Sequence, residues 1–351
     1  MRFLRSLLLV CVVAVALASC SAGGTTAAPP AGFAGAPALP DTFTVADWNA
    51  TAALPEVGPV GRATLMYRAT SGLFLLLADG RQYRLPRPPR AEGRQGSMRA
   101  TISPDGHWLG HRTARLAMDP RYVFRELTGS RRIETSGTPV LWSADGHRVL
   151  MAVDNDRASQ LTMVDLVAGR TGPAGFTRFQ DNLWLAGLLP DGRPMFAGFA
   201  DGGLRMRIGE RGHTMPFHSN PDHACWCPNL PLGLSPDGAR LALRLAHASG
   251  LDPVTGEKVR VMPDEPNQII TLDLSTDAIR HRVSLPVRDE SDQWRLLSHT
   301  GAGVLLQHSV NGQVSLVLVD AASGEQLRTC QPPAGVFELF VPGEVEHGTD
   351  G

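Results

Sequence analysis

The sequence lacks the motifs that mark several large enzyme classes. It contains no Gly-x-Ser-x-Gly elbow, no phosphate-cradling glycine-rich loop and no His-Glu-x-x-His pair. A nucleophilic serine on a strand-to-helix turn needs the first motif, a nucleotide phosphate the second and a helical zinc site the third. Their absence disfavours an elbow-type serine hydrolase, a P-loop nucleotide enzyme and a zinc protease of this kind.

Helical patterning and an excess of charge of either sign are also missing. No long stretch after residue 40 keeps hydrophobic residues at helical spacing, and the 37 glycines and 27 prolines would break any long helix. An all-β fold is therefore predicted. The net charge is -1, so nothing in the overall charge suggests a nucleic acid or another polyanion as a partner.

Lysine is almost absent. Lys258 is the only lysine, and arginine carries the remaining positive charge. Arginines outnumber acids most clearly between residues 81 and 132, where one run consists of Arg81, Arg84, Arg87, Arg90, Arg94 and Arg99. This run is either an ordinary solvated face or a basic patch that faces anionic lipid headgroups or cell-wall polymers. The sequence leaves both interpretations open.

The N-terminus has the pattern of a secretory signal. Arg2 and Arg5 precede a hydrophobic run over residues 7–17, and the small residues Ala18 and Ser19 follow it. Such an order of charge, hydrophobic core and small residues is typical of export signals. The run is shorter than the roughly 20 residues that a stable membrane-spanning helix needs, so a permanent transmembrane anchor is the weaker interpretation.

The end of this signal resembles the bacterial lipobox. Residues 17–20 read Leu-Ala-Ser-Cys, a leucine and two small residues before a cysteine. The resemblance implies that Cys20 receives a diacylglyceryl group and becomes the mature N-terminus after residues 1–19 are removed. The chain is then exported and held at the outer face of a bacterial membrane by its acyl chains. The alternative is an ordinary secretory signal in which the cysteine occurs by chance.

A tether is predicted between the lipid and the folded domain. Residues 20–40 consist mainly of glycine, alanine, proline, serine and threonine and carry no charge. Such a segment buries too little hydrophobic surface to offset the entropy lost on ordering, so it acts as a flexible linker.

One short unit recurs along the rest of the chain. Ser-Pro-Asp-Gly or a close variant is flanked by short hydrophobic runs, and its Asp-Gly steps are Asp105-Gly106, Asp145-Gly146, Asp191-Gly192 and Asp237-Gly238. Proline presets φ in such a turn, aspartate bonds to its own backbone and glycine accepts a positive φ, so we assign these residues to structural turns. A degenerate copy begins at Leu297. The spacing matches one four-stranded propeller blade.

These units resemble the WD40-like repeats of the TolB propeller group over residues 102–329. The resemblance implies a β-propeller over residues 41–343, with six blades or alternatively seven if residues 41–60 form strands, and a disordered tail over residues 344–351. The first blade has no Ser-Pro-Asp-Gly copy. We expect residues 336–341 to supply its missing strand, because joining both ends of the chain in one blade closes the ring.

Three cysteines remain in the mature chain, namely Cys225, Cys227 and Cys330. Outside the cytoplasm one disulfide is expected. Cys225 with Cys227 would close a very small and strained ring. A bond from either one to Cys330 closes a larger loop and is preferred, although the sequence alone does not decide the pairing.

The segment from residue 213 to 227 is the one candidate for metal binding. It contains His213, His218, His223, Cys225 and Cys227, and imidazole and thiolate are ligands for zinc or copper. The spacing matches no known finger, so a polar connection between blades without a cofactor is the simpler interpretation.

The leading functional hypothesis is a lipid-anchored binding or scaffold module for a protein or an envelope polymer. The rival is an enzyme on a propeller scaffold, such as a lyase, a lactonase or a hydrolase, and a metal-handling lipoprotein is a further alternative. Propeller loops around the channel mouth can serve either role. Charged side chains from different blades that converge at one end of the channel would favour the enzyme, and an apolar lining would favour binding.

Overall fold

The computed structural model describes residues 39–86, 100–113, 121–153, 160–181, 183–200, 203–214, 226–247, 267–287 and 292–345. The chain divides into two units, Met1–Ala31 and Gly32–Gly351, and every described residue belongs to the second. These residues form strands and turns without any helix, which confirms the all-β prediction. Accordingly, the described part of the chain offers no helix of the length and hydropathy needed to cross a membrane.

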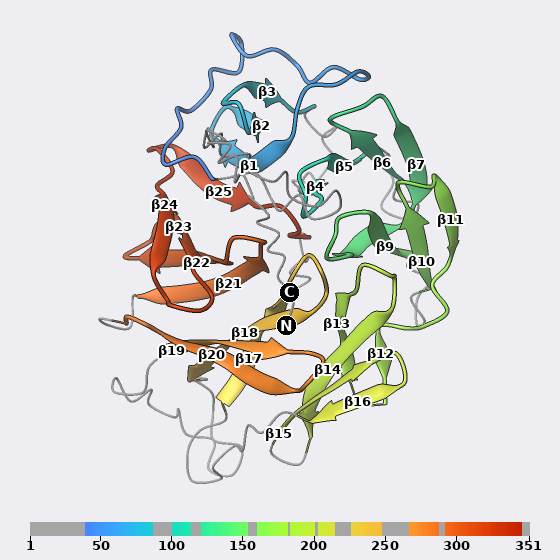
Figure 1. Cartoon of the computed structure of the whole chain (residues 1–351). Coiled ribbons are helices and arrows are strands. Elements are labelled where there is room, and N and C mark those ends of the chain that lie inside the picture. The colour runs from blue at the N-terminus through green and yellow to red at the C-terminus, as the bar shows by residue number, and fades with distance from the viewer. Residues whose placement is uncertain are drawn as a thin grey trace, which may run out of the picture. The chain divides into compact units, whose positions relative to one another are not determined.

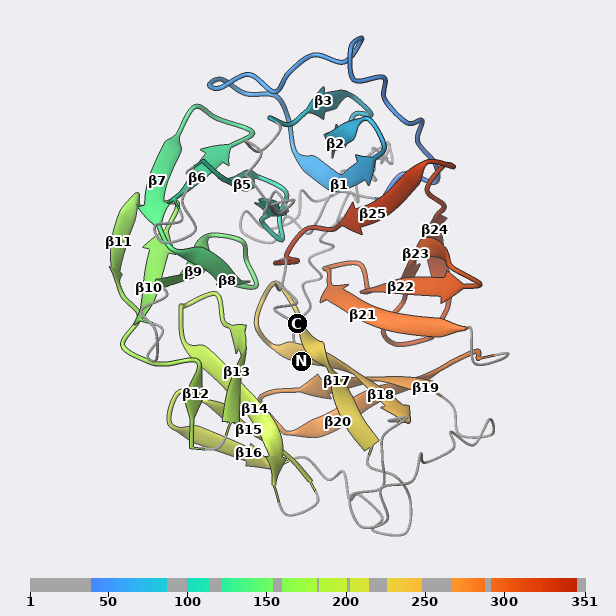
Figure 2. The same cartoon turned by 180° about the vertical axis from the view of Figure 1, so that it is seen from behind.

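Six antiparallel sheets, here called blades I to VI, are arranged around a centre (Figures 1 and 2). Blade I comprises β25 (Val336–Phe340), β1 (Ala63–Ala69), β2 (Gly72–Leu77) and β3 (Gln82–Arg84). Blade II comprises β4 (Ala100–Ile102), β5 (Trp108–Arg112), β6 (Arg121–Glu126) and β7 (Arg132–Ser136). Blade III comprises β8 (Thr138–Trp142), β9 (Arg148–Val153), β10 (Gln160–Asp165) and β11 (Arg170–Pro173).

The remaining three blades follow in chain order. Blade IV has a fifth strand and comprises β12 (Phe179–Gln180), β13 (Leu183–Leu188), β14 (Pro194–Ala200), β15 (Gly203–Ile208) and β16 (Arg211–Thr214). Blade V comprises β17 (Trp226–Leu234), β18 (Arg240–His247), β19 (Asn267–Asp273) and β20 (Ala278–Leu285). Blade VI comprises β21 (Gln293–His299), β22 (Val304–Val310), β23 (Gln313–Val319) and β24 (Gln326–Cys330). The six-bladed propeller is confirmed.

The ring closes through blade I. Strand β25 comes from the C-terminal end of the propeller and pairs with β1, with Met66 opposite Phe340. This pairing covers the edge of β1, as the expected closure requires. The seven-blade alternative is wrong, because residues 41–60 contain no strand and only Ala53 forms an isolated bridge, to Arg84. They pack over blade I instead, where Trp48 meets Phe74 edge-on at 5.7 Å between ring centroids.

Hydrophobic side chains fill the spaces between neighbouring blades. Trp108 and Trp142, both next to repeat turns, are 2% and 4% exposed and belong to one cluster shared by blades II and III. Similar clusters join blades I and II, IV and V, V and VI, and VI and I. Because both faces of a blade are covered in this way, the strands show only weak alternation of polar and apolar residues.

The repeat turns form one compact corner in each of blades II to V. In blade II, Asp105 Oδ1 accepts hydrogen bonds from Ser103 Oγ at 2.5 Å and from the backbone N–H of His107 at 3.1 Å. The corners of blades III and V repeat the serine–aspartate bond at 2.6 and 2.5 Å. The glycine that follows each aspartate has a positive φ: Gly106 73°, Gly146 77°, Gly192 88° and Gly238 69°.

Neighbouring corners also touch, which adds a second reason for glycine. A Cβ atom on Gly146 would lie 2.7 Å from Asp105 Oδ1, and one on Gly238 would lie 2.7 Å from Pro190 Cδ. Arg148 donates to the carbonyl oxygen of Pro190 and so joins blade III to the corner of blade IV. The corners therefore join blades as well as reverse the chain.

Both ends of the described chain pack against the propeller. Leu39, at the end of the predicted tether, is 5% exposed in the cluster between blades VI and I. Val345, assigned to the tail, is 8% exposed between blades II and III. The predicted signal peptide and most of the predicted tether lie outside the described residues, as do residues 346–351.

Candidate binding site at one end of the channel

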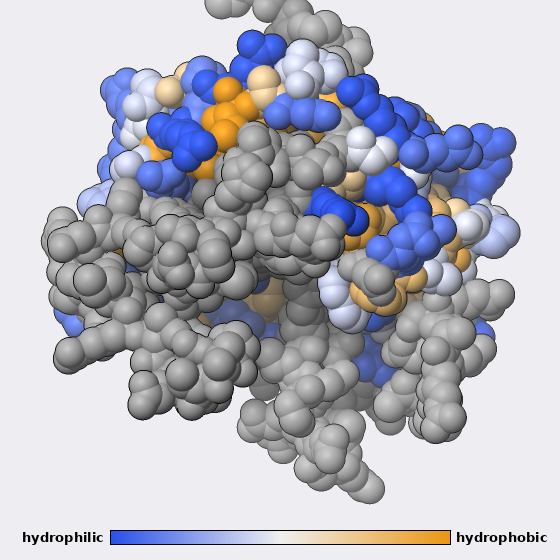
Figure 3. Space-filling model, turned by 90° about the horizontal axis from the view of Figure 1, so that it is seen from below, coloured by the Kyte–Doolittle hydropathy of each residue, from blue (hydrophilic) through white to orange (hydrophobic). Residues whose placement is uncertain are grey.

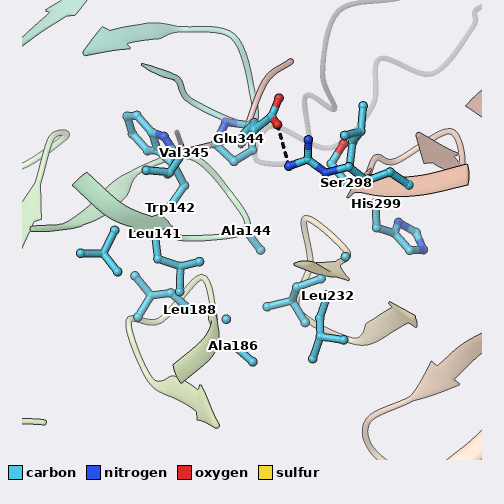
Figure 4. A pocket seen from close by; sticks show the side chains of 18 residues that line it. Leu141, Trp142, Ala144, Ala186, Leu188, Leu232, Ser298, His299, Glu344 and Val345 are labelled. Carbon is cyan, nitrogen blue, oxygen red and sulfur yellow. Dashed lines mark ion pairs between the residues drawn. The ribbon is translucent and has the colours of Figure 1, made fainter. Parts of the chain in front are cut away.

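A cavity of about 100 Å³ lies where the inner strands end. Its walls come from the ends of β8, β13, β17 and β21, and the chain after β25 closes one side of it (Figure 4). Each of these inner strands except β21 runs into an Asp-Gly corner, so the repeat itself brings their last residues together around the centre.

The cavity lining is mostly hydrophobic. Representative side chains are Leu141, Trp142, Leu188, Leu232, Leu297 and Val345. The polar side chains of the lining are Arg295, Ser298, His299 and Glu344, and they come from β21 and the C-terminal segment (Figure 4). Charged groups from several blades therefore do not converge on the cavity.

The two charged side chains of the lining pair with each other. Arg295 Nη2 lies 3.0 Å from Glu344 Oε1, and the backbone N–H of Val341 donates to Glu344 Oε2 at 3.3 Å. The Glu344 side chain is 15% exposed and that of Arg295 is 48% exposed. Burial raises the pKa of the Glu344 carboxyl, and the nearby Arg295 charge opposes this shift. The ion pair therefore holds both charged side chains of the lining together on one side of the cavity.

A chain of hydrogen bonds holds Glu344 in place. Gly343 N donates to Ile102 O at 2.8 Å, Thr101 Oγ1 donates to Glu344 O at 2.7 Å and Trp142 Nε1 donates to Thr101 Oγ1 at 2.7 Å. The C-terminal segment therefore bonds to blade II, ion-pairs with blade VI and seals one side of the cavity.

His299 is the remaining titratable residue of the lining. It is 9% exposed, and its Nδ1 lies 2.8 Å from Thr300 O, so Nδ1 carries the proton that this carbonyl accepts. Its Nε2 is buried and has no hydrogen-bond partner among the described residues. Burial lowers the pKa of the imidazole, so it is neutral at physiological pH.

A histidine–aspartate pair lies elsewhere in blade VI. His308 Nε2 is 2.5 Å from Oδ1 of Asp292, whose side chain is 2% exposed, and the imidazole stacks on Trp294 at 3.8 Å. A buried carboxylate fixes the tautomer and orientation of an imidazole in this way. Since all three residues belong to one blade and none lines the cavity, the pair does not meet the criterion for an enzyme site.

The other predicted site residues fall in two groups. Cys20, His218, His223 and Cys225 lie outside the described residues. His213 is in β16 opposite Met206 and Cys227 is in β17 opposite Ala246, and the description of both stops at the backbone. Within the described ranges, no three His, Cys, Asp or Glu side chains are grouped to hold a metal ion. The metal site therefore stays a prediction.

Cys330 is buried in the cluster between blades VI and I and carries a free thiol. Burial raises the pKa of this thiol to about 11. The thiolate is therefore scarce at neutral pH, so the thiol is unreactive. Since the Cys330 thiol is free, the expected bond from Cys330 to Cys225 or Cys227 is not formed in this structure. The alternative bond between Cys225 and Cys227 stays a prediction, because those two side chains are not described.

Sequence reasoning missed Arg295, His299 and Glu344. A signal existed for His299, because it is the last residue before the corner of blade VI. The equivalent residues of blades II to V are all hydrophobic, namely Ile102, Trp142, Leu188 and Leu234. A histidine at a hydrophobic repeat position marks the site. Glu344 carried no such signal, since it lies beyond the last repeat.

Comparison with known proteins gives structural likeness only. No family model matches the chain, and no curated protein matches its sequence. The fold is similar to TolB. The TolB structure from Acinetobacter baumannii has 16% identity and a TM-score of 0.43, with 78% of this chain and 67% of that chain covered.

Two further solved structures show the same level of likeness. A putative TolB from Agrobacterium tumefaciens has 14% identity and a TM-score of 0.36, with coverage of 65% of this chain and 81% of that chain. A chain of a nidogen/laminin complex has 10% identity and a TM-score of 0.41, with coverage of 79% and 96%. These likenesses carry no conclusion about activity.

Proposed function

We propose that the protein is a lipid-anchored β-propeller that binds a protein or glycan partner at the outer face of a bacterial membrane. The observation that carries the binding role is the cavity lining, which is mostly hydrophobic and whose two charged side chains neutralise each other. Propeller enzymes need free polar groups from several blades at one end of the channel. The anchor is inferred from residues 17–20.

An exposed aromatic pair supports a binding role. Phe179 and Trp184 are 46% and 58% exposed, and their rings lie 4.8 Å apart on the β12–β13 hairpin of blade IV. The hairpin is held by Asp181, which adopts a φ of 53° and pairs with Arg207. Rigid exposed aromatic side chains are typical anchors of binding interfaces. On the edge-on face in Figure 3 the described surface is mainly hydrophilic, with small hydrophobic patches.

The partner can be tested by photo-crosslinking in intact cells. A photo-reactive residue at Phe179 or Trp184 is expected to capture the same neighbour, whereas one at Val57, which is 65% exposed elsewhere, captures none. Mass spectrometry identifies a protein neighbour, and binding to purified envelope polymers identifies a glycan. A protein that gives equal capture at all three positions, and that turns over a small substrate rapidly, would support the rival propeller enzyme instead.

The anchor has a separate test. Cys20→Ser is expected to abolish incorporation of a labelled fatty acid and to move the protein from the membrane to the soluble fraction of the envelope. Equal labelling of both proteins would rule out lipid on Cys20.

The metal alternative predicts stoichiometric zinc or copper in protein purified without chelator, and a fold that metal addition does not stabilise would contradict it.

A further inference from the structure

Most of the described arginines in the basic stretch have partners that account for them. Arg81 pairs with Asp79 at 2.7 Å, Arg131 with Glu126 at 2.8 Å and Arg121 with Glu134 at 3.6 Å. Arg84 donates to Trp48 O at 3.0 Å and lies over the Trp48 ring. These contacts favour the solvated-face interpretation for this part of the stretch.

Arg125 differs from these four arginines because it is buried. It is 3% exposed, on β6 of blade II, and its Nη2 donates to Gly58 O at 2.7 Å. Its Nε and Nη1 are buried and have no hydrogen-bond partner among the described residues. Buried guanidinium groups are ordinarily paired with a carboxylate, because an isolated charge costs several kcal/mol to remove from water.

The neighbours of Arg125 are hydrophobic, neutral or basic, since Arg132 lies opposite it on β7. The space between blades I and II is filled by a hydrophobic cluster that includes Leu77, Leu85 and Leu109, with Tyr83 packed against it. Leu109 pairs directly with Arg125 in the sheet. Burial lowers the pKa of the guanidinium, and Tyr83 opposes this shift. Among the described residues, no carboxylate pairs with the free N–H groups of this buried charge.

We propose that Arg125 binds one small monovalent anion, of the size of chloride, between blades I and II. The anion accepts the unused N–H groups and neutralises the charge, whereas a water molecule would satisfy hydrogen bonds and leave the charge uncompensated. A small ion is required because both nitrogens are closed to solvent and protein interiors are close-packed. The site does not depend on the binding role proposed above.

The inference is tested with the purified full chain at constant ionic strength. Chloride is exchanged for gluconate, which is too large to enter the interior, and urea unfolding is followed. An ion that binds only the folded state raises the folding equilibrium constant about tenfold for each tenfold rise in chloride above its dissociation constant. This dependence is expected in the wild type and in Arg121→Met, which removes an exposed arginine from the same strand, and is expected to vanish in Arg125→Met.

Crystals grown in bromide give a second measurement that does not rely on the variant folding. An anomalous bromide peak within hydrogen-bond distance of Nε or Nη1 of Arg125 supports the site. A water molecule there, with no anomalous signal and no chloride dependence of unfolding, overturns it. A chloride dependence that persists in Arg125→Met also overturns it, because the ion then binds elsewhere.

Discussion

Blades V and VI reverse the chain at the same place in different ways. In blade V the last paired residues are Leu234 and Leu241, and Asp237 braces the turn through Ser235. In blade VI the last pair is His299 and Val304, so the chain turns over residues 300–303 instead of 235–240. Thr300 Oγ1 there accepts the N–H groups of Ala302 and Gly303 at 3.2 and 3.1 Å.

The comparison shows that the blade needs a braced reversal and not one particular motif. A carboxylate and a hydroxyl both supply the acceptor that the backbone N–H groups require. The shorter turn brings Gly303 against blade VI itself, whereas the glycines of the longer turns face the preceding blade. Glycine is therefore needed in both kinds of corner, but for different physical reasons.

The largest effect is expected from Gly303→Ala. A Cβ atom at Gly303 would lie 2.2 Å from the backbone oxygen of Val319, and backbone cannot move aside as a flexible side chain can. We expect a loss of about 3 kcal/mol in the free energy of unfolding, measured by urea denaturation. Gly192→Ala is the control, because its Cβ would meet only the Arg148 side chain, at 3.6 Å from Cδ and 3.8 Å from Nε, and φ is +88°. Its cost should be about 1–2 kcal/mol. Equal losses of stability in Gly303→Ala and Gly192→Ala would contradict a backbone clash at Gly303.

A smaller effect is expected from Asp145→Ala in blade III. Asp145 accepts from Ser143 Oγ at 2.6 Å and from His147 N at 3.1 Å, and loss of both bonds should cost about 1–2 kcal/mol. Asp145→Asn keeps an acceptor oxygen and should lose much less. The hydrogen bond that the His147 ring donates to the Asp145 carboxylate raises the pKa of His147, so an NMR titration should show that pKa falling in both variants. An unchanged pKa of His147 in both variants would contradict the interaction between Asp145 and His147.

His299→Leu restores the hydrophobic residue that blades II to V carry before the corner. It removes a buried Nε2 without a partner, so we expect a gain of about 1 kcal/mol at neutral pH. Burial and the charge of Arg240 lower the pKa of His299, while Thr300 O and Asp237 oppose the shift. As the pH falls through about 6.5, the unfolded chain therefore takes up the proton first and the wild type loses stability. The gain should grow from pH 7.5 to pH 5, and parallel stability curves would contradict it.

The architecture was predictable because the repeat is local. Asp-Gly corners at regular spacing define the blades, and the hydrophobic run over residues 336–341 indicated the closing strand. The cavity was not predictable, since its charged pair joins Arg295 of blade VI to Glu344 beyond the last repeat. Arg125 was not predictable either. It lies in a stretch rich in arginine, and only its burial in the folded structure distinguishes it. Residues 41–60 suggested strands by position alone, yet they pack as an irregular segment on blade I.

The smallest effect is expected at the arginine that follows the blade IV corner. Arg193 pairs with Asp191 at 2.6 Å, but the two side chains are 58% and 51% exposed. Exposed pairs of this kind contribute little, so Arg193→Gln should change the free energy of unfolding by less than about 0.5 kcal/mol. Arg148→Gln is the matched comparison, because Arg148 reaches the same corner from blade III and donates to Pro190 O. Its side chain is 28% exposed, and its loss removes a bond between two blades. A larger loss for Arg193→Gln than for Arg148→Gln would mean that the corners act within blades and not between them.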